Sequence, residues 1–530
     1  MIRVDTYMGN DKMKQFIRGA FILTIAGFIS KILSAFYRIP IQNLTGDYGF
    51  YIYQQIYPFI ATVTILSLYS FPAAISKLGA ELGKKKVSFK HFLLPIFLIL
   101  LCINGLLFLI IYVLSPVIAM TSGNISLKIA YQTIAFAFLV VPFLAVSRGF
   151  YQAKGKMEQT AFSQLIEQII RVGIIIYICY LIFIGQLDIY KIGDIGALAT
   201  IIGMVAAILF LFFTFFNEKK DVQIQPYKIP WLYYLRTLLF FGVVTSLNHM
   251  VFIIIQFGDV FTLIPNLLTY GFSAEEAMVW KGVFDRGVPL IQLGIVIGSS
   301  FAVALIPVIS ANKSLDHVST TIQHALALCL YIAGGATVGV IVLFPEINLL
   351  LFNDMKGTTS LRIFALAILF ISMIVTINAI LQSLGYMFRT VFYILIIFLL
   401  KIGLNKLLIP HFGLVGASYA TVISLSLLAI ITIYQLKKVV PSYSLFSGIK
   451  GTSFMIANGG MAIYLLICKY ILPFNYFSRI TLLVYVMFLV ASGAIIYFII
   501  LLRYKAFNEE QINIFPFSAY IQKLSLFLSR

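Results

Sequence analysis

The chain has 530 residues, of which 61% are hydrophobic and only 11% are charged. Soluble domains are nearer half apolar and a quarter charged, so this composition excludes a soluble globular protein and indicates one that crosses a membrane many times. A formal net charge of +19 is also typical of nucleic-acid-binding proteins. Here, however, the basic residues are distributed in the way that sets membrane topology, so no nucleic-acid partner is expected.

Apolar runs of about 20 residues, the length that crosses the hydrocarbon core, recur along the whole chain. Fourteen spans are predicted, at 16–38, 50–74, 92–114, 126–149, 163–184, 193–216, 235–262, 280–306, 322–344, 361–384, 390–409, 413–435, 451–472 and 479–503. Most of the 38 Lys and Arg residues lie before the first span, after even-numbered spans, or in the C-terminal tail. The positive-inside rule therefore predicts that both termini are cytoplasmic.

The expected fold is an all-α polytopic membrane protein with two parallel six-helix lobes around a central cleft and two extra C-terminal helices. The similar motifs GDIGA and GLVGA begin spans six and twelve and favour a repeat of parallel halves. A charged stretch with two prolines separates these halves and reads as a linker. The predicted domains are the N-terminal lobe (1–216), a cytoplasmic linker (217–234), the C-terminal lobe (235–435), spans thirteen and fourteen (436–503) and a cytoplasmic amphipathic tail (504–530).

No enzyme motif is recognisable. The four cysteines lie singly in apolar runs, which favours small apolar fillers over a metal site or a disulfide framework. The chain has no GxxxxGK[ST] sequence, so it does not bind ATP through a P-loop. We therefore expect no cofactor, no firm metal site and no catalytic residues. Transport would be driven by an ion gradient, by the membrane potential, or by consumption of the product.

Cations inside the predicted spans are the first candidate site residues. Each costs about 2.5 to 3.5 kcal/mol at mid-membrane, so it should face protein or water and serve a function. Lys31 and Arg38 are seven residues apart and lie on one helix face, about 10 Å apart along the axis. Arg286 comes from span eight. Arginine and lysine together suit phosphate oxygens, so these three residues predict an anion-binding cleft.

The remaining ionisable residues of the spans have two readings each. Glu167 and Arg171 are four residues apart on span five, which favours a structural ion pair within one helix. Asp285 is adjacent to Arg286, so the two side chains point in different directions and Asp285 pairs elsewhere. Asp259 in span seven and the Lys401–Asn405 pair in span eleven fit either a coupling-ion or proton site, or a static charge pair.

Several motifs together resemble the bacterial family that contains MurJ, YtgP and the stage V sporulation protein B. They are ISKILSAFYRIP (29–40), GDYGFYIYQQIYPF (46–59), PAAISKLGAE (72–81), SRGFYQAKGKMEQTAFSQLIEQIIRV (147–172), FDRGVPLIQLG (284–294) and ALIPVIS (304–310). This family belongs to the multidrug/oligosaccharidyl-lipid/polysaccharide exporter superfamily. The resemblance extends over most of the chain.

The resemblance implies a fourteen-helix flippase that moves lipid-linked cell-wall precursors to the outer leaflet. Lys31, Arg38 and Arg286 take the places of the family's essential basic residues, and the last two helices border a groove for the lipid tail. Some members bind sodium between helices seven, eleven and twelve. Here Lys401 and Asn405 lie alongside Thr421 without an acid, so the lysine ammonium would take the place of the cation.

The function expected is the flipping of an undecaprenyl-pyrophosphate-linked precursor, most of all lipid II, by alternating access in the bacterial cytoplasmic membrane. Its partners would be this lipid-linked oligosaccharide, membrane lipids and the cell-wall synthesis machinery. The alternatives are export of another lipid-linked polysaccharide or teichoic acid unit, multidrug antiport, a membrane glycosyltransferase, or a scaffold for wall synthesis. A multidrug antiporter would require an acidic cavity, which disagrees with the three cations. A glycosyltransferase would require a large outer loop with acid or His pairs, whereas the loops here are short.

Overall fold

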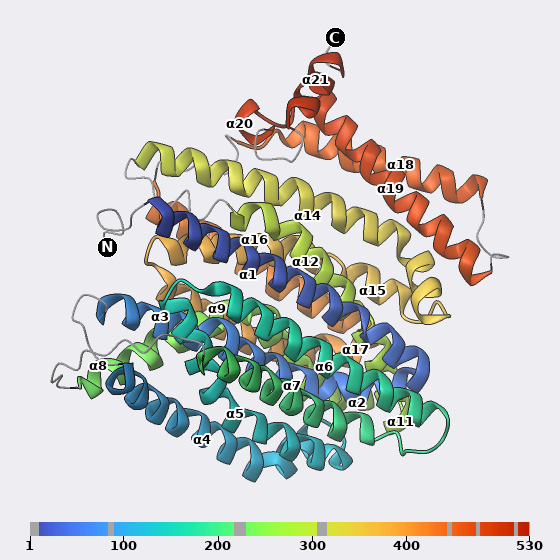
Figure 1. Cartoon of the computed structure of the whole chain (residues 1–530). Helices are drawn as coiled ribbons and strands as arrows, with labels where there is room; N and C mark the ends of the chain where they lie inside the picture. The colour runs from blue at the N-terminus through green and yellow to red at the C-terminus, as the bar shows by residue number, and fades with distance from the viewer. Residues whose placement is uncertain are drawn as a thin grey trace. The chain divides into compact units, whose positions relative to one another are not determined.

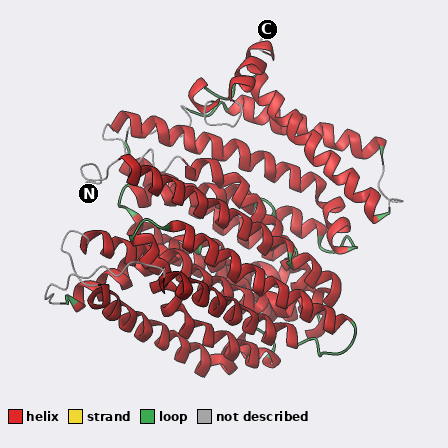
Figure 2. Ribbon diagram, in the orientation of Figure 1, coloured by secondary structure: helices red, strands yellow, loops and turns green. Residues whose placement is uncertain are grey.

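The structure is a computed structural model that describes residues 10–82, 89–216, 229–304, 315–441, 448–472, 478–512 and 518–528. All regular structure among these residues is helical (Figure 2). The chain forms two compact units. Unit 1 contains residues 1–268 and 272–282, and unit 2 contains residues 269–271 and 283–530.

Unit 1 is built from helices that pack in sequence-local pairs. Its helices are α1 (Asn10–Phe36), α2 (Arg38–Ile65), α3 (Phe71–Leu82), α4 (Phe89–Thr121), α5 (Lys128–Ala153), α6 (Met157–Phe183), α7 (Lys191–Phe216), α8 (Trp231–Arg236), α9 (Val243–His249) and most of α10 (Val251–Tyr270) and α11 (Ala274–Asp285). Short connections place α4 beside α5 and α6 beside α7 (Figure 1). Helix α6 also packs against α1 and α2, which brings the predicted cations of these three helices into one unit.

A glycine reverses the chain near the start of α2. Gly46 has φ 68° and ψ −176°, a backbone conformation that only glycine adopts without strain. The hydroxyls of Tyr37 and Tyr53, sixteen residues apart, form a hydrogen bond across the turn. In a straight helix these residues would be about 24 Å apart, so α2 is a tight hairpin rather than one rod.

Two π-helical stretches interrupt unit 1 and contact each other. The first, η1 (Leu66–Ser70), joins α2 to α3, and the second, η4 (Thr237–Gly242), joins α8 to α9. Pro72 explains the first stretch, because it lacks an N–H and its ring cannot follow a regular α-helical turn. The wider turn leaves the backbone of Ser67 accessible to a side chain from a neighbouring helix.

Unit 2 contains the second set of helices. These are α12 (Gly287–Ala304), α14 (Leu315–Phe352), α15 (Thr358–Phe364), α16 (Ala367–Ser383), α17 (Met387–Val439), α18 (Gly451–Ile471), α19 (Arg479–Arg503), α20 (Glu509–Ile512) and α21 (Ser518–Leu528). One apolar cluster joins α14, α18 and α19 to the tail residues Ala506, Phe507 and Ile512. A second cluster joins α14 and α16 to the end of α17.

Helix α17 is a hairpin that turns at Gly413, which has φ 55° and ψ −134°. A Cβ at Gly416 would overlap the carbonyl oxygen of Leu408, so the two arms touch next to the turn. The arms are 387–412 and 414–439. Glycines at 413 and 416 thus allow a turn and a close helix contact at once.

The fold class predicted from the sequence is confirmed. Eleven segments of the described residues are long and apolar enough to cross a membrane. Two of these segments, Ile25–Ala80 and Phe388–Val439, contain two predicted spans each, and α11 with α12 corresponds to the predicted eighth span. Every predicted span therefore has a helical counterpart. Residues 217–228 of the predicted linker and 305–310 of the ALIPVIS motif lie outside the described residues, and the domain division stays a prediction.

Candidate functional site

Arg38, the first residue of α2, is completely buried in unit 1. Its guanidinium stacks on the ring of Tyr57, with the carbon Cζ 3.7 Å from the ring centre. Nη2 donates a long hydrogen bond of 3.5 Å to Ser34 Oγ. Nε and Nη1 are buried and no acceptor among the described residues meets them at hydrogen-bond geometry, although the guanidinium interacts with the Tyr37 hydroxyl. Each unpaired buried donor costs about 1–3 kcal/mol, so this cation is poised to receive an acceptor.

Lys31 lies on α1, seven residues before Arg38, on an almost continuous helix. The backbone N–H of Tyr37 donates to the carbonyl of Leu33, and Tyr37, the single residue between α1 and α2, has backbone angles in the α-helical region. Lys31 is exposed, whereas Arg38 is buried. The two predicted partners therefore belong to consecutive helices of one unit but differ in the exposed area of their side chains.

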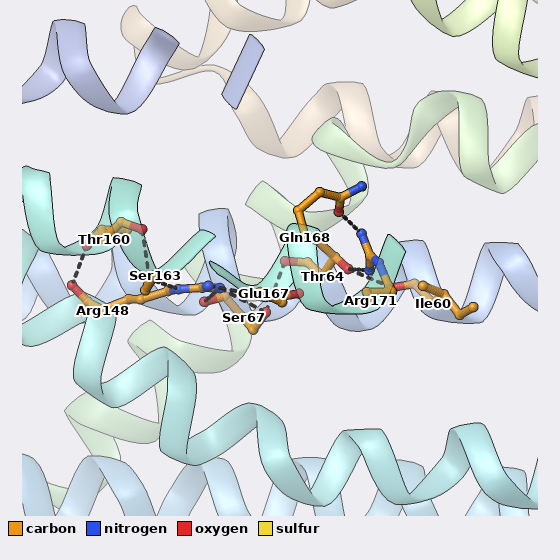
Figure 3. A network of polar contacts seen from close by, with 9 residues as sticks. All are labelled: Ile60, Thr64, Ser67, Arg148, Thr160, Ser163, Glu167, Gln168 and Arg171. Carbon is orange, nitrogen blue, oxygen red and sulfur yellow. Dashed lines mark hydrogen bonds and ion pairs between the residues drawn. The ribbon is translucent and has the colours of Figure 1, made fainter. Parts of the chain in front are cut away.

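The structure pairs Glu167 of α6 with Arg148 of α5 instead of the predicted Arg171. Arg148 Nη2 lies 2.8 Å from Glu167 Oε2, and both side chains are almost wholly buried. Nε donates to Ser163 Oγ at 3.0 Å, and Nη1 donates to the carbonyl and hydroxyl of Ser67 in η1, each at 3.5 Å. Figure 3 shows this network. Every nitrogen of Arg148 thus has an acceptor, which explains why Arg148 holds the carboxylate.

Arg171 lies one helical turn beyond Glu167 and has its own contacts. Nη1 donates to Thr64 Oγ1 of α2 at 3.3 Å, and Nη2 donates to Gln168 Oε1 of its own helix. Nε is buried without a partner among the described residues. Figure 3 shows its guanidinium between Thr64 and Gln168, apart from the pair of Arg148 and Glu167. Arg171 therefore remains a cation whose described hydrogen bonds go to neutral acceptors.

Arg286 of unit 2 forms a bidentate ion pair. It lies at the turn between α11 and α12, where its N–H donates to the carbonyl of Val283. Nη1 and Nη2 lie 2.6 and 3.0 Å from the two carboxylate oxygens of Asp354. Nη1 also reaches Asn348 Oδ1 at 3.4 Å, and the guanidinium lies 5.2 Å from the ring centre of Phe352. The fork that would bind phosphate oxygens thus holds a carboxylate here.

The loop between α14 and α15 presents Asp354 to Arg286. Asn348 Nδ2 donates to the carbonyl of Lys356 and to Thr358 Oγ1, and the N–H of Lys356 donates to Asp354 Oδ1. Partial burial raises the pKa of Asp354, but the hydrogen bonds from Arg286 and Lys356 outweigh it, so the net pKa is lowered from its ordinary value. The carboxylate is therefore ionised throughout the neutral range.

A capping box starts α11, the helix that leads to Arg286. The N–H and hydroxyl of Ser273 donate to Glu276 Oε2 at 2.9 and 2.8 Å, and the N–H of Glu276 lies 3.3 Å from Ser273 Oγ. The backbone hydrogen bond from Ser273 lowers the pKa of the exposed Glu276 carboxyl. These hydrogen bonds fix the first turn of α11, which precedes the apolar residues of the helix.

The structure brings together the predicted residues of α17. Lys401 Nζ donates to Asn405 Oδ1 at 2.9 Å, to Thr421 Oγ1 at 2.7 Å and to the carbonyl of Ala417 at 3.2 Å. Lys401, Asn405 and Thr421 are all fully buried. Two acceptors come from the second arm of the hairpin, so a single ammonium joins the arms. Three oxygens around one buried positive charge form what we call the ammonium cage.

The two predicted acids lie in different units. Asp259 is buried in α10 of unit 1, and Asp285 is buried at the end of α11, in the part that belongs to unit 2. No group of three or more His, Cys, Asp or Glu side chains suited to a metal ion occurs within the described ranges. Whether Lys31 and Arg38 act together with Arg286 remains a prediction, because the two residue sets belong to separate units.

Two residues of these networks are absent from the sequence-based site. Arg148 lies inside the predicted span 126–149, and its position among apolar residues was the available signal. Asp354 follows the ninth predicted span in a short polar loop, and nothing in the local sequence indicates its partner. Both contacts join residues at least nineteen positions apart.

The comparisons with known proteins agree on one family. Residues 16–313 match the model of the family described as polysaccharide biosynthesis protein. The chain is 34% identical to the uncharacterised membrane protein YabM of Bacillus subtilis, over 97% of this chain and 96% of that protein. It is 27% identical to the stage V sporulation protein B of the same organism, over 80% and 84% of the two chains. The lipid II flippase MurJ of B. subtilis is 24% identical, over 76% and 79%.

Solved structures show the same fold. The lipid II flippase MurJ in an inward-closed conformation matches with a TM-score of 0.66 and 15% identity, over 91% of this chain and 98% of that chain. An inward-facing multidrug transporter of the MATE family, in the MOP superfamily, matches with a TM-score of 0.59 and 15% identity, over 79% and 96%. The chain is therefore a multi-pass membrane protein that belongs to the polysaccharide biosynthesis protein family, in the branch that resembles MurJ and the stage V sporulation protein B.

Proposed function

We propose that the protein flips a lipid-linked saccharide precursor from the inner to the outer leaflet of the bacterial cytoplasmic membrane, by alternating access. The substrate that we propose first is lipid II, an undecaprenyl-diphosphate-linked unit. In this proposal both termini are cytoplasmic, and the bound diphosphate contacts Lys31, Arg38 and Arg286. The lipid tail stays in the membrane beside α18 and α19.

The buried guanidinium of Arg38 is the observation that carries this proposal. Two of its nitrogens lack a partner among the described residues, and an aromatic ring covers one face. A guanidinium in such a site is complementary to phosphate oxygens, because its fork donates parallel charge-assisted hydrogen bonds. The similarity to MurJ supports a diphosphate lipid as the source of those oxygens.

Arg286 supports the same proposal from unit 2. The two terminal nitrogens of its guanidinium already bind the carboxylate of Asp354. A carboxylate presents two oxygens in one plane, and a guanidinium binds such a pair through two parallel hydrogen bonds. We propose that Asp354 occupies this fork in the absence of substrate and that the diphosphate replaces it. A loop that leaves Arg286 when the substrate arrives would couple binding to a change of conformation.

The membrane potential is a sufficient driving force for this cargo. With the inside negative, outward movement of one net negative charge is favoured by about 2.3 kcal/mol per 100 mV. The ammonium cage of Lys401 carries a fixed positive charge in a nest of three oxygens. We propose that this charge replaces a bound coupling cation and that transport requires no sodium gradient.

A second candidate is another lipid-linked unit, such as a capsule or teichoic acid precursor. The match to the family described as polysaccharide biosynthesis protein supports it. Multidrug antiport is disfavoured, because the buried cations of unit 1 would repel a cationic drug.

Complementation tests the proposal. The chain is expressed in a bacterium depleted of its own lipid II flippase, beside the variants Arg38→Gln and Arg286→Ala. We expect the unchanged chain alone to restore growth, with all three proteins present in the membrane. Failure of the unchanged chain, once it is shown to be in the membrane, would rule out lipid II and leave the second candidate.

A further inference from the structure

Around α2 and α6, unit 1 contains more buried positive than negative charge, and its other buried acid, Asp259, lies on α10. Around α2 and α6 lie three buried guanidiniums, those of Arg38, Arg148 and Arg171, and one carboxylate, that of Glu167. Arg148 holds the carboxylate at 2.8 Å and has an acceptor for every nitrogen. Among the described residues, no carboxylate lies within ion-pair distance of Arg38 or Arg171, and Arg171 interacts with Glu167 only through longer-range electrostatics. A buried charge is retained at considerable cost unless a counter-ion arrives.

The partners of these two guanidiniums lie on one face of α2. Tyr53, Tyr57 and Thr64 follow the helical repeat and lie on the same face of α2. Arg38 stacks on Tyr57, and Arg171 donates to Thr64. The positions of Tyr57 and Thr64 are seven residues apart, about 10 Å along the axis, which two arginine side chains can close.

Tyrosines link the two guanidiniums. The Tyr37 and Tyr53 hydroxyls share a hydrogen bond, and the Tyr53 and Tyr57 rings have centroids 6.4 Å apart. Tyr53 interacts electrostatically with both Arg38 and Arg171. Both guanidiniums also interact with Tyr37 and Tyr57. Hydroxyls can donate as well as accept, so this cluster offers an anion further hydrogen bonds.

Unused donors point to a missing ligand rather than to a finished structural contact. Nε and Nη1 of Arg38 and Nε of Arg171 are buried without partners within the described ranges. Arg148 in the same unit is the contrasting case. It donates to Ser163 and Glu167 of α6 and to Ser67, so each of its nitrogens has an acceptor.

We propose that Arg171 is a further diphosphate-binding residue, which together with Arg38 forms the unit 1 part of the anion site. The ligand class is a diphosphate group with an adjoining neutral or lipid moiety. This inference rests on the proposed function and adds to it a residue of α6. Arg148 acts as a positioning residue, because it holds the Glu167 carboxylate in direct contact and leaves Arg171 only its longer-range attraction.

Binding measurements on the purified full chain test this inference. Farnesyl diphosphate is the lipid probe, and its affinity is measured by titration in detergent for the unchanged chain and for Arg171→Gln. We expect affinity to fall about tenfold or more, as for the loss of a charge-assisted hydrogen bond. Lys191→Gln is the matched control, because it also removes one positive charge from unit 1 but from an exposed side chain. It should bind as the unchanged chain does.

The variant Arg171→Lys separates binding from folding. Lysine keeps the charge and can still donate to Thr64, but it lacks the fork, so we expect an intermediate affinity and a normal melting temperature. Equal affinities in the unchanged chain, Arg171→Gln and Arg171→Lys would overturn the proposal, whatever their melting temperatures. If only the melting temperature fell in Arg171→Gln, the residue would be a structural tie.

The same titrations distinguish a free pyrophosphate ligand from a lipid diphosphate. They also test the proposed function separately from this inference. Displacement of the probe by inorganic pyrophosphate would show that the free anion suffices, and lack of displacement would assign the site to the lipid. Arg171 is supported in either case if its replacement weakens the probe. An unchanged chain that binds no probe would overturn the proposed function itself. Binding that depends on Arg38 but not on Arg171 would overturn only this inference.

Discussion

Glu167 is paired with Arg148 on the neighbouring helix, at 2.8 Å, although Arg171 stands only one turn away on its own helix. An ion pair within one helix is worth only about 0.3–0.5 kcal/mol at an exposed site. A buried carboxylate gains more from a guanidinium whose other nitrogens are also satisfied. Because Glu167 contacts Arg148, the hydrogen bonds of Arg171 go to neutral acceptors, and Arg171 can bind an anion.

Removal of Glu167 should destabilise unit 1. In Glu167→Gln, Arg148 becomes a buried cation without a counter-ion, which costs about 3–5 kcal/mol. We expect a clearly lower melting temperature for the purified protein in detergent. An unchanged melting temperature would show that the pair contributes nothing to stability.

The double variant Arg148→Met and Glu167→Met is the control for this prediction. Replacing both partners of a buried pair by apolar residues of similar size is often neutral. We expect the melting temperature to recover most of the loss. If the double variant were as unstable as Glu167→Gln, the packing of α5 against α6 rather than the charge would be responsible.

Arg286→Ala should abolish flipping without preventing membrane insertion. The substitution removes the fork that holds Asp354 and, in our proposal, the diphosphate. Lysine retains the charge but not the bidentate geometry, so Arg286→Lys should keep only part of the activity. Transport and membrane content are measured on the same cells, and normal flipping by Arg286→Ala would contradict the assignment.

The ion pair of Arg286 and Asp354 should make stability depend on pH in the acid range. The pKa of Asp354 in the folded protein lies below its ordinary value of 3.8. Such a group stabilises the fold fully above its unfolded pKa and loses this contribution as the pH falls through its folded pKa. Asp354→Asn should therefore melt at a lower temperature than the unchanged chain near neutral pH, and the difference should close below 3.8. A difference that grew in acid would contradict this sign.

The ammonium cage predicts transport without sodium. Flipping by the unchanged chain should be equal when potassium replaces sodium, because Lys401 already supplies the positive charge. In Lys401→Ala the three oxygens lose their donor, so we expect a lower melting temperature that added sodium partly restores. Sodium-dependent flipping by the unchanged chain would contradict the role given to Lys401.

The turn of α17 should tolerate no side chain. Gly413→Ala places a Cβ at φ 55° and 3.0 Å from the ring of Tyr270, and strain of this kind costs about 1–3 kcal/mol. Gly403→Ala, in the first arm of the same helix, meets nothing within 4 Å and should be neutral or gain about 0.5–1 kcal/mol. Thermal unfolding of both variants checks this contrast, and equal effects would argue against the glycine-dependent turn.

Hydropathy and charge predicted the all-α membrane fold and the positions of the spans, because each span must satisfy its own backbone within the bilayer. The pairing of Lys401 with Asn405 was also predictable, since the two are helix neighbours, whereas Thr421 was indicated only by the family resemblance and Ala417 was not predicted. The partners of Glu167 and Arg286 were not, because Arg148 and Asp354 meet them only through tertiary packing. The hairpin at Gly46 likewise depends on a backbone conformation that a run of apolar residues does not indicate.

Flipping itself is the most direct test of the central claim. Fluorescent lipid II is placed in vesicles with the purified protein, and its appearance in the opposite leaflet is followed by quenching from one side. The account predicts rapid, protein-dependent movement that Arg38→Gln removes, while Lys191→Gln leaves it intact. Movement that is absent with the unchanged chain, or that persists in Arg38→Gln, would contradict the account.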